Sequence, residues 1–414
     1  MPGSDNLPSL AGQAWLSSAA TQGVLAVIEA GGHQARAVGG VVRNGLLGLA
    51  ITDIDIATTA LPQDVMRLAR AADLGVAETG LQHGTVTVIA DHCPFEVTTL
   101  RRDVESHGRH ATVAFTDDWT EDARRRDFTM NALYCDRSGR VHDPLGGYTD
   151  LIARRVCFIG DAADRIREDY LRILRFFRFT AQYAEGGHDA VGLLACARLR
   201  GGLAQLSRER IHQEMTRLLT ARRAVEAVMV MQAHGILAEI LPAAPRPTVF
   251  RRLTEIETAL AWKPDAMLRL AALGVVTSED ASRIGRAFKV SRAEHGILDL
   301  GASETARLTT PPSQGSARKL VYTQGPDNYR RLIALSLAGA IAYSTTDPLW
   351  IAALTLPDRW AAPKLPVTGA DVMARGVAAG PAVGDALRRI EAWWIARDFA
   401  PSRDELLAQL DLSA

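Results

Sequence analysis

Hydrophobic and polar residues alternate along several short stretches of the first 100 residues, and this pattern predicts β-strands. Other segments carry apolar residues at helical spacing, and a proline near the start of 62–72 favours a helix there. We therefore expect a small mixed sheet of four or five strands with helices. The strands are predicted at 35–38, 53–57, from 77 onward, 85–90 and 95–100, and further helices at 10–30 and 119–132.

Beyond residue 151 the strand pattern is almost absent, and apolar residues recur at the spacing of helices. Segments rich in proline and glycine interrupt this pattern near 242–247, 310–315, 325 and 361–366. A chain of 414 residues exceeds a single hydrophobic core, so two to four domains are expected. The pattern predicts a small α/β head followed by a long all-α remainder.

The segment 162–184 has the clearest helical periodicity. Its apolar positions form one stripe, which indicates a side facing the core. The residues of the stripe are Ile166, Tyr170, Ile173, Leu174, Phe177 and Ala181. On another face, Asp169, Arg172, Arg175 and Arg178 follow one another at intervals of three, so they are neighbours on a helix. A ladder of surface ion pairs is one interpretation of this face.

Recognition of a nucleotide base is the other interpretation. Cytosine and adenine present an amino group beside a ring-nitrogen acceptor, whereas uracil and guanine present a carbonyl beside an N–H. A carboxylate can accept from the amino group while a guanidinium donates to the ring nitrogen. The wrong bases would leave both side chains unpaired, which can give rejection on the order of 10⁴-fold. Asp169 and Arg172 are the candidates for this role, and Arg175 and Arg178 are candidates for binding phosphates.

Composition narrows the class of protein. The 47 basic and 47 acidic residues give a formal net charge of zero, but only four of the basic residues are lysines. Arginine offers a planar fork for phosphates and base edges, and a neutral total leaves room for a basic groove. The four cysteines form no Cys-x-x-Cys pair, so neither a zinc site nor a disulfide framework is indicated. No signal peptide or apolar run of 18 residues is found, so a cytoplasmic protein is expected.

The stretch 38–59 carries the strongest candidate chemistry. Gly39 and Gly40 lack a Cβ, so their amides can approach a phosphate, and Arg43 follows on a short predicted helix. Asp53 and Asp55 alternate on the next predicted strand, so their carboxylates point to one side. Two carboxylates aimed at one point repel each other unless a cation such as Mg²⁺ lies between them. Singly, these features are typical of a turn and a solvated strand end, whereas their order and spacing indicate nucleotidyl transfer.

Residues 101–116 are polar, with His107, Arg109 and His110 near the centre. We expect a mobile loop beside the sheet, and an inert surface loop is the alternative.

Several motifs resemble those of the class II tRNA nucleotidyltransferase/poly(A) polymerase family, and within it the bacterial CCA-adding enzymes. GGVVRNGLLG (39–48) and DIDIAT (53–58) resemble the nucleotidyltransferase signature with its two metal-binding aspartates. The other similar motifs are RRDFTMNAL (125–133, ribose discrimination), DPLGGYTDL (143–151, head–neck junction), REDYLRILRFFRF (167–179, base recognition), SRERIHQE (207–214, support of that helix) and a Gly-Pro turn within 368–387.

The resemblance implies an α/β nucleotidyltransferase head over 1–150, followed by an all-α neck (151–220), body (221–300) and tail (301–414), the tail binding tRNA. Asp53 and Asp55 would bind Mg²⁺, with Glu96 as a third, supporting carboxylate. The residues implied to contact the nucleotide are Gly39, Gly40, Arg43, Arg126, Asp127, Asn131, Asp169, Arg172, Arg175 and Arg178. Arg109 and His110 fall where the family has a flexible loop.

The implied activity is template-independent addition or repair of the 3′-terminal CCA of tRNA from CTP and ATP, with release of pyrophosphate. The implied partners are the tRNA 3′ end and these nucleotides, without a membrane or protein partner. Relatives that add only CC, only A, or poly(A) share the same motifs and remain alternatives. A noncatalytic RNA-binding protein is the alternative from another class. One position departs from the family, because Asn44 stands where an aspartate usually follows the signature arginine.

Overall fold

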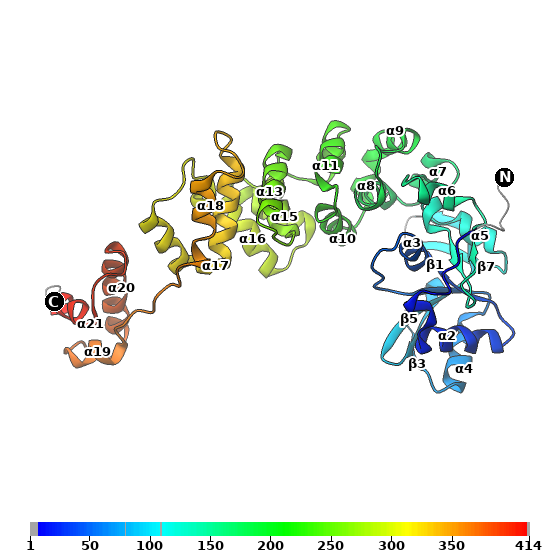
Figure 1. Ribbon diagram of the computed structural model, residues 1–414, viewed down its shortest axis with the longest axis horizontal. Helices are drawn as coiled ribbons and strands as arrows, with labels where there is room; N and C mark the ends of the chain where they lie inside the picture. The colour runs from blue at the N-terminus through cyan, green and yellow to red at the C-terminus, as the bar shows by residue number, and fades with distance from the viewer. Residues whose placement is uncertain (1–6, 79, 108–109, 412–414) are drawn as a thin grey trace. The chain divides into compact units, whose positions relative to one another are not determined.

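The computed structural model describes residues 7–78, 80–107 and 110–411 (Figure 1). The chain divides into two compact units, residues 1–240 and residues 241–414. The first unit contains both β-sheets and a set of helices, and the described part of the second unit contains helices and no strands. The predicted fold, an α/β head followed by an all-α remainder, is confirmed.

The main sheet has seven strands rather than the four or five expected. Its order is β3-β4-β5-β2-β1-β8-β9, with β2 and β5 parallel and the other neighbours antiparallel. Two of its strands have only two residues, which is too short for an alternating pattern to predict. The strands are β1 (Ala35–Val38), β2 (Asp55–Thr58), β3 (Gly75–Ala77), β4 (Thr85–Ala90), β5 (Cys93–Thr99), β8 (Tyr134–Cys135) and β9 (Val141–His142).

The helices of the first unit alternate with strands as far as α6, and from α7 onward they follow one another without further strands. They are α1 (Ala14–Ser17), α2 (Ala19–Ala30), α3 (Gly40–Leu46), α4 (Pro62–Ala71), α5 (Trp119–Arg124), α6 (Gly147–Ile152), α7 (Ala162–Glu168), α8 (Leu171–Tyr183), α9 (Ala190–Leu199), α10 (Arg208–Leu219), α11 (Ala224–Ala233) and α12 (Ile236–Ile240). Short 3-10 turns are η2 (Leu81–His83), η3 (Thr129–Asn131) and η4 (Arg200–Gln205).

Helices α2 and α4 contact each other and strand β4. Leu25 and Ile28 of α2 and Val65 of α4 are buried there, as the apolar spacing predicts. The expected helix over 10–30 is two helices, because Ser18 adopts an extended conformation and its side chain accepts a hydrogen bond from the Thr21 amide to start α2.

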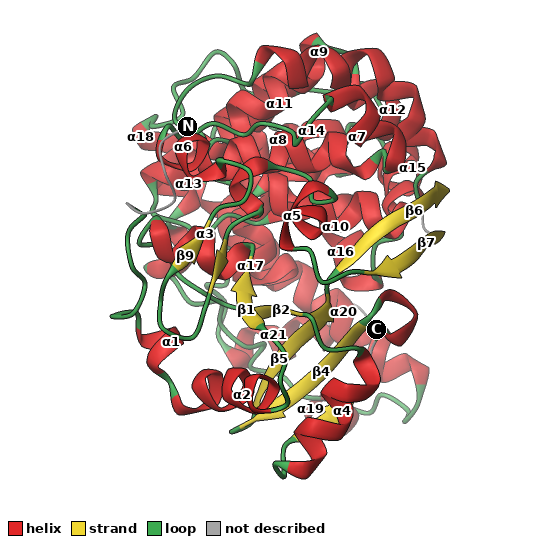
Figure 2. Cartoon of the chain, turned by 90° about the vertical axis from the view of Figure 1, so that its right-hand side faces the viewer, coloured by secondary structure: helices red, strands yellow, loops and turns green. Residues whose placement is uncertain are grey.

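The prediction of a loop over 101–116 was wrong. The chain forms an antiparallel hairpin of β6 (Arg101–His107) and β7 (His110–Phe115), separate from the main sheet in the pairing of its strands (Figure 2). A two-stranded ribbon does not need a continuous apolar face, so its polar sequence gives a weak strand signal. Arg109 lies outside the described residues, and His110 begins β7.

Two predicted helices differ from expectation, because one ends early and the other is interrupted. The helix from Trp119 stops at Arg124, because the chain becomes extended by Phe128, which bridges to Phe158. The continuous helix predicted over 162–184 is interrupted at Asp169, whose extended backbone separates α7 from α8. Phe128, Phe158, Phe176 and Phe179 then pack with ring centroids 5.0–6.4 Å apart, which fixes α8 against the end of the α/β head.

The described part of the second unit includes a larger and a smaller hydrophobic core. In the larger one, Leu253 of α13, Ile333 of α17 and Trp350 of α18 are fully buried, and in the smaller one Val372 and Trp394 are buried with their neighbours. The elements are α13 (Pro247–Ala259), α14 (Ala266–Gly274), α15 (Ser278–Phe288), α16 (Arg292–Ala302), η5 (Glu304–Arg307), α17 (Gln314–Gly339), α18 (Pro348–Leu354), η6 (Leu356–Asp358), α19 (Gly369–Ala374), α20 (Pro381–Ala396) and α21 (Arg403–Asp411).

The sequence break predicted near 325 is a kink rather than a loop. Gly325 has φ +76° and ψ 163° in the middle of α17, directly before Pro326. In the described parts of the chain, no helix combines the length and apolar character required to cross a membrane.

Candidate active site

Strands β2 and β5 bring two acidic side chains together at one place on the sheet. They are parallel neighbours, and their register sets Asp55 opposite Glu96. Partial burial and the negative charges of Glu96 and Asp53 together raise the pKa of Asp55 to about 6, although the residue as a whole remains exposed to solvent. The fold therefore gathers negative charge from Asp53, Asp55 and Glu96, as a cation site requires.

Asp53 does not lie on the strand that the sequence predicts for it. β2 begins at Asp55, and Asp53 belongs to the irregular segment before the strand, where its carboxylate accepts a hydrogen bond from the Thr52 hydroxyl at 2.9 Å. Strand alternation therefore does not place the two aspartates side by side. Their proximity comes from the segment that leads into β2.

The Gly39-Gly40 turn joins β1 to α3. Gly39 has φ +68° and ψ −115°, a conformation that a residue with a Cβ rarely adopts. A Cβ built at Gly39 would lie 3.6 Å from a terminal nitrogen of Arg126, so this turn runs beside that guanidinium. The positive charge of Arg126 in turn lowers the pKa of Asp55, which connects the turn to the acidic site.

Arg126 is held by a buried carboxylate that the sequence analysis missed. Asp122, which is 1% exposed, forms ion pairs with Arg126 at 3.1 Å and with Arg125 at 2.7 Å. The Tyr134 hydroxyl donates to the same carboxylate at 2.8 Å. Burial opposes ionisation of Asp122, but the two guanidinium groups lower its pKa to about 2. The carboxylate is therefore charged at neutral pH and fixes both arginines.

A second polar network runs from α3 to the residues that follow α5. The Arg43 guanidinium is buried and donates to the Asn131 side-chain oxygen at 2.5 Å. The Asn131 amide nitrogen donates to Asp127 at 2.9 Å. Arg43 also donates to the Tyr183 hydroxyl at 2.6 Å and lies 4.1 Å from the centre of that ring. Arg43, Asn131 and Asp127, which the sequence predicts to contact the nucleotide, are thus joined by hydrogen bonds. Tyr183 is a fourth member that the sequence did not predict.

The same network continues into the helical part of the unit. Arg175 of α8 forms an ion pair with Asp127 at 2.6 Å, and it lies 3.5 Å from Glu214 of α10. Glu214 accepts from Arg178 at 2.5 Å. Burial opposes ionisation of Asp127, but Arg175 and Asn131 lower its pKa to about 2. The predicted residues Arg43, Asn131, Asp127, Arg175 and Arg178 therefore form one connected set.

The structure does not join Asp169 to Arg172 as the helical spacing suggested. Asp169 forms a two-pronged ion pair with Arg210 of α10, at 3.1 and 2.6 Å. Arg172 instead donates to Glu168 at 2.5 Å and to the Arg125 carbonyl at 3.0 Å. The helix break at Asp169 explains the difference, because the two side chains no longer occupy successive turns of one helix. Asp169 and Arg210 also line a pocket of about 370 Å³.

Comparison with known proteins gives the family of the chain. Residues 35–157 match the model of the poly A polymerase head domain, and residues 193–246 match "Probable RNA and SrmB- binding site of polymerase A". The mitochondrial CCA tRNA nucleotidyltransferase 1 of Mus musculus is 33% identical over 387 residues, which cover 91% of this chain and 86% of that protein. The chain belongs to the tRNA nucleotidyltransferase/poly(A) polymerase family.

Two bacterial comparisons agree with this membership. The CCA-adding enzyme of Geobacillus stearothermophilus is 32% identical over 380 residues, covering 89% of this chain and 90% of that protein. The crystal structure of Bacillus stearothermophilus CCA-adding enzyme in complex with CTP superposes with a TM-score of 0.73 at 26% identity, covering 95% of this chain and 96% of that one. The family predicted from the sequence motifs is confirmed.

Family nucleotidyltransferases of this type normally use divalent metal ions. In the described residues, no cluster of three or more histidine, cysteine, aspartate or glutamate side chains is arranged to hold a metal ion. Asp53, Asp55 and Glu96 nevertheless provide hard oxygen ligands whose mutual repulsion a cation would relieve. This donor set fits Mg²⁺, which is typically bound by one or two carboxylates together with water and substrate phosphates.

Several residues of the site were not predicted from the sequence, although the spacing or motif around some of them indicated a role. Asp122 precedes Arg125 and Arg126 by three and four residues, the spacing of helical ion pairs. Arg210 and Glu214 lie within the motif 207–214, which was expected to support α8. Tyr183 had no such signal, because only the packing of α8 brings it to Arg43.

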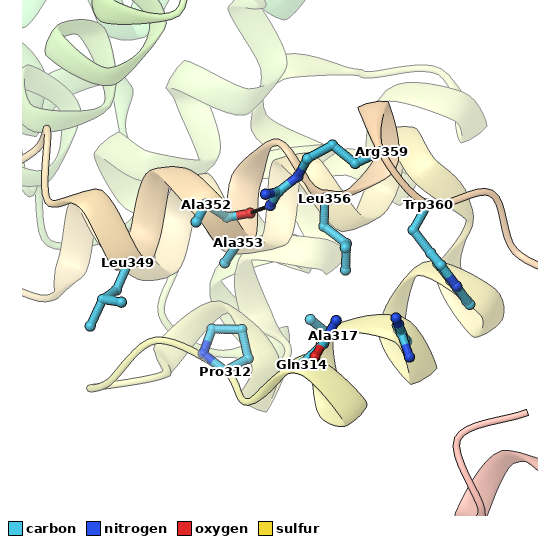
Figure 3. Close-up of a pocket in the computed structure, with 10 residues that line it drawn as sticks. Pro312, Gln314, Ala317, Leu349, Ala352, Ala353, Leu356, Arg359 and Trp360 are labelled. Carbon is cyan, nitrogen blue, oxygen red and sulfur yellow. Dashed lines mark hydrogen bonds between the residues drawn. The ribbon is translucent and has the colours of Figure 1, made fainter. Parts of the chain in front are cut away.

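The second unit contains a separate pocket of about 380 Å³ between the start of α17 and the segment α18–η6 (Figure 3). Leu349, Leu356 and Trp360 contribute apolar surface, and Arg359 donates a hydrogen bond to the Ala352 carbonyl at its edge. None of the residues that the sequence assigns to the nucleotide lines this pocket. We therefore place the candidate active site in the first unit.

Proposed function

We propose that the protein adds or repairs the 3′-terminal CCA of tRNA, using CTP and ATP and releasing pyrophosphate. The observation that carries the proposal is the network from Arg43 through Asn131 and Asp127 to Arg175. The Gly39 turn runs beside both Asn131 and Arg126, and the charge of Arg126 acts on Asp55, which connects this network to the acidic group. The names of the relatives support the same activity, since they are CCA tRNA nucleotidyltransferases and CCA-adding enzymes.

In this mechanism the chain mainly positions the reactants. The Gly39 N–H donates to the Leu133 carbonyl at 3.1 Å, so the turn offers the triphosphate the amide of Gly40, and the arginines offer further donors for its oxygens. The 3′-hydroxyl of the tRNA attacks the α-phosphate in line, and pyrophosphate leaves. A divalent ion held by Asp53 and Asp55 would lower the pKa of the tRNA 3′-hydroxyl and would offset negative charge on the reacting phosphate. Mg²⁺ is the ion that we propose.

Asp169 and Arg172 are proposed to select the base. Their functional groups match the amino group and ring nitrogen shared by cytosine and adenine, and they lie at the junction of α7 and α8. In the structure both side chains are occupied by protein partners, Arg210 and Glu168 respectively. We infer that the incoming base must compete with these contacts, and that only a base with matching polarity does so successfully.

A primer-extension assay tests the proposal. The full-length protein is incubated with Mg²⁺ and each nucleoside triphosphate, together with tRNAs that lack CCA, CA or only the final A. A CCA-adding enzyme extends all three with C or A as required and then stops. Extension only to CC, only by the final A, or by a longer A tract would identify one of the narrower relatives instead.

A noncatalytic RNA-binding protein is the alternative of another class. It would bind tRNA but incorporate no nucleotide under any of these conditions. Asp53→Ala separates the two, since it should abolish incorporation while leaving tRNA binding intact. Incorporation that persists in this variant would remove Asp53 from the site.

Two further features are proposed from the sequence. One is the four-part division into head (1–150), neck (151–220), body (221–300) and tail (301–414), with tRNA bound by the tail. Limited proteolysis with and without tRNA tests this division. The other is location in the cytoplasm, which imaging of a tagged chain tests.

A further inference from the structure

Asn44 occupies an unusual place beside the proposed triphosphate site. Its side-chain oxygen accepts two hydrogen bonds from Arg43, at 3.2 and 3.0 Å, and a third from the Tyr183 hydroxyl at 3.3 Å. Its side-chain nitrogen donates to the Ala50 carbonyl at 2.8 Å. The amide therefore uses both its acceptor and its donor, and each contact leads to a different segment.

The donor contact concerns the segment that carries Asp53. Leu49 donates its backbone N–H to the Asn44 carbonyl at 2.9 Å, so Asn44 holds two consecutive residues of the segment between α3 and β2. Asp53 follows Ala50 by three residues and precedes β2. A fixed Ala50 shortens the free length of chain between this anchor and β2, which restricts the positions available to Asp53.

The acceptor contact concerns the charge of Arg43. Within the part of the chain that the structure describes, Arg43 forms no ion pair, and its side-chain partners Asn44, Asn131 and Tyr183 are neutral. Burial lowers the pKa of Arg43 from its ordinary value, yet an arginine stays protonated at neutral pH. Its positive charge is thus oriented by neutral groups rather than neutralised by a carboxylate.

An aspartate at position 44 could not perform both tasks. It would still accept from Arg43 and Tyr183, but it has no N–H for the Ala50 carbonyl and would place a negative charge against that oxygen. It would also pair with Arg43 and reduce the positive charge available to an anionic ligand. The contacts of Asn44 therefore require an amide rather than a carboxylate.

We propose that Asn44 is a positioning residue for nucleotide binding. It orients Arg43 without neutralising the positive charge of that side chain, and it tethers the segment that carries Asp53 through the Ala50 carbonyl. This inference rests on the proposed function for its kinetic consequence, whereas the tether itself is a property of the fold. Asn44 does not need to touch the substrate, because its effect passes through Arg43 and through the segment 47–54.

The test compares Asn44→Asp and Asn44→Ala in the full-length protein, using CTP and a tRNA primer that lacks CCA. Loss of the hydrogen bond to the Ala50 carbonyl, together with neutralisation of Arg43, should raise the KM for CTP about tenfold in Asn44→Asp. Asn44→Ala keeps the charge of Arg43, so its KM should rise less, by about threefold. In both variants the KM for the tRNA primer should stay within twofold of the unaltered protein.

Hydrogen–deuterium exchange provides the second measurement, and it does not depend on activity. Both variants should exchange the amides of segment 47–53 faster than the unaltered protein, with little change in β4 or β5. Asn328→Asp is a matched control, because Asn328 also accepts from a nearby arginine, Arg331 of the second unit. It should change neither the KM for CTP nor the exchange of 47–53.

The two measurements keep the inference separate from the proposed function. If the unaltered protein incorporated no nucleotide, the proposed function would fail while the exchange data still tested the tether. Unchanged exchange in both variants would overturn the tether. An Asn44→Asp protein with a KM for CTP equal to or below that of the unaltered protein would overturn the role in nucleotide binding.

Discussion

Arg175 of α8 donates from Nε to Asp127 at 2.7 Å, and this contact joins two residues that are 48 positions apart in the chain. Asp127 also accepts from Asn131, and through it the contact reaches Arg43 in the glycine-turn region. The α/β head and the first helices after it are therefore coupled by charged groups rather than by apolar packing alone. Perturbing this contact should affect stability and nucleotide binding together.

Removing the carboxylate of this pair should destabilise the fold. Asp127→Asn removes a buried carboxylate and leaves the half-buried Arg175 guanidinium without its main counterion, since Glu214 lies further away at 3.5 Å. Breaking one partner of a buried ion pair costs about 3 kcal/mol. Urea unfolding measures this change. Glu255→Gln breaks an exposed pair with Arg251 and should cost less than about 1 kcal/mol; equal losses in both variants would contradict the argument.

The acidic group should be essential for turnover. Asp55→Ala should lower the rate of CTP incorporation by at least about a thousandfold, since bound metal supplies several kcal/mol of transition-state stabilisation. The affinity for tRNA, measured by filter binding, should remain close to that of the unaltered protein. Asp64→Ala, which removes a carboxylate of a surface pair on α4, is the control and should leave the rate unchanged.

Glu96 should control the ionisation of Asp55. Partial burial and the charge of Glu96 raise the pKa of Asp55 to about 6, so Glu96→Gln should lower it toward its ordinary value. Because the folded-state pKa lies above the unfolded value, the ionised carboxylate opposes folding above about pH 6. The variant should therefore stabilise the metal-free protein at pH 7–8. Carboxyl NMR titration and thermal unfolding in a chelator measure the two effects, and an unchanged pKa would separate Glu96 from the site.

Asp122 should contribute stability that disappears in acid. Burial opposes its ionisation, but Arg126 and Arg125 lower its pKa to about 2, below the unfolded value. Its contribution, on the order of 2 kcal/mol, is therefore complete above about pH 4 and is lost as the pH falls toward 2. Asp122→Asn should be less stable at pH 7, and its stability should fall less steeply between pH 4 and 2. Parallel pH profiles of the two proteins would contradict this.

Base selection should depend on Asp169. Asp169→Asn replaces one carboxylate oxygen by a donor, so the ratio of CTP to UTP incorporation should fall roughly 100-fold. Competition assays with both nucleotides measure the ratio directly. Asp164→Asn, which alters an exposed pair with Arg167 on α7, is the matched control. A ratio that changes equally in the two variants would remove Asp169 from base recognition.

The sequence by itself determined the fold class, the family and the motifs of the candidate site. Helix α2 and strands β4 and β5 follow from apolar periodicity, because the burial of one face fixes the spacing of apolar residues within each segment. The turn at Gly39 can likewise be predicted from the local sequence, because its positive φ is rarely adopted by residues other than glycine.

Only the tertiary structure decided which charged groups pair. The sequence spacing suggested Asp169 with Arg172, whereas the fold pairs Asp169 with Arg210 and Arg175 with Asp127. The physical reason is that ion pairs and hydrogen bonds depend on distances of a few ångströms between segments that are remote in the chain. Periodicity does not encode those distances, and a single helix break at Asp169 is enough to redirect them.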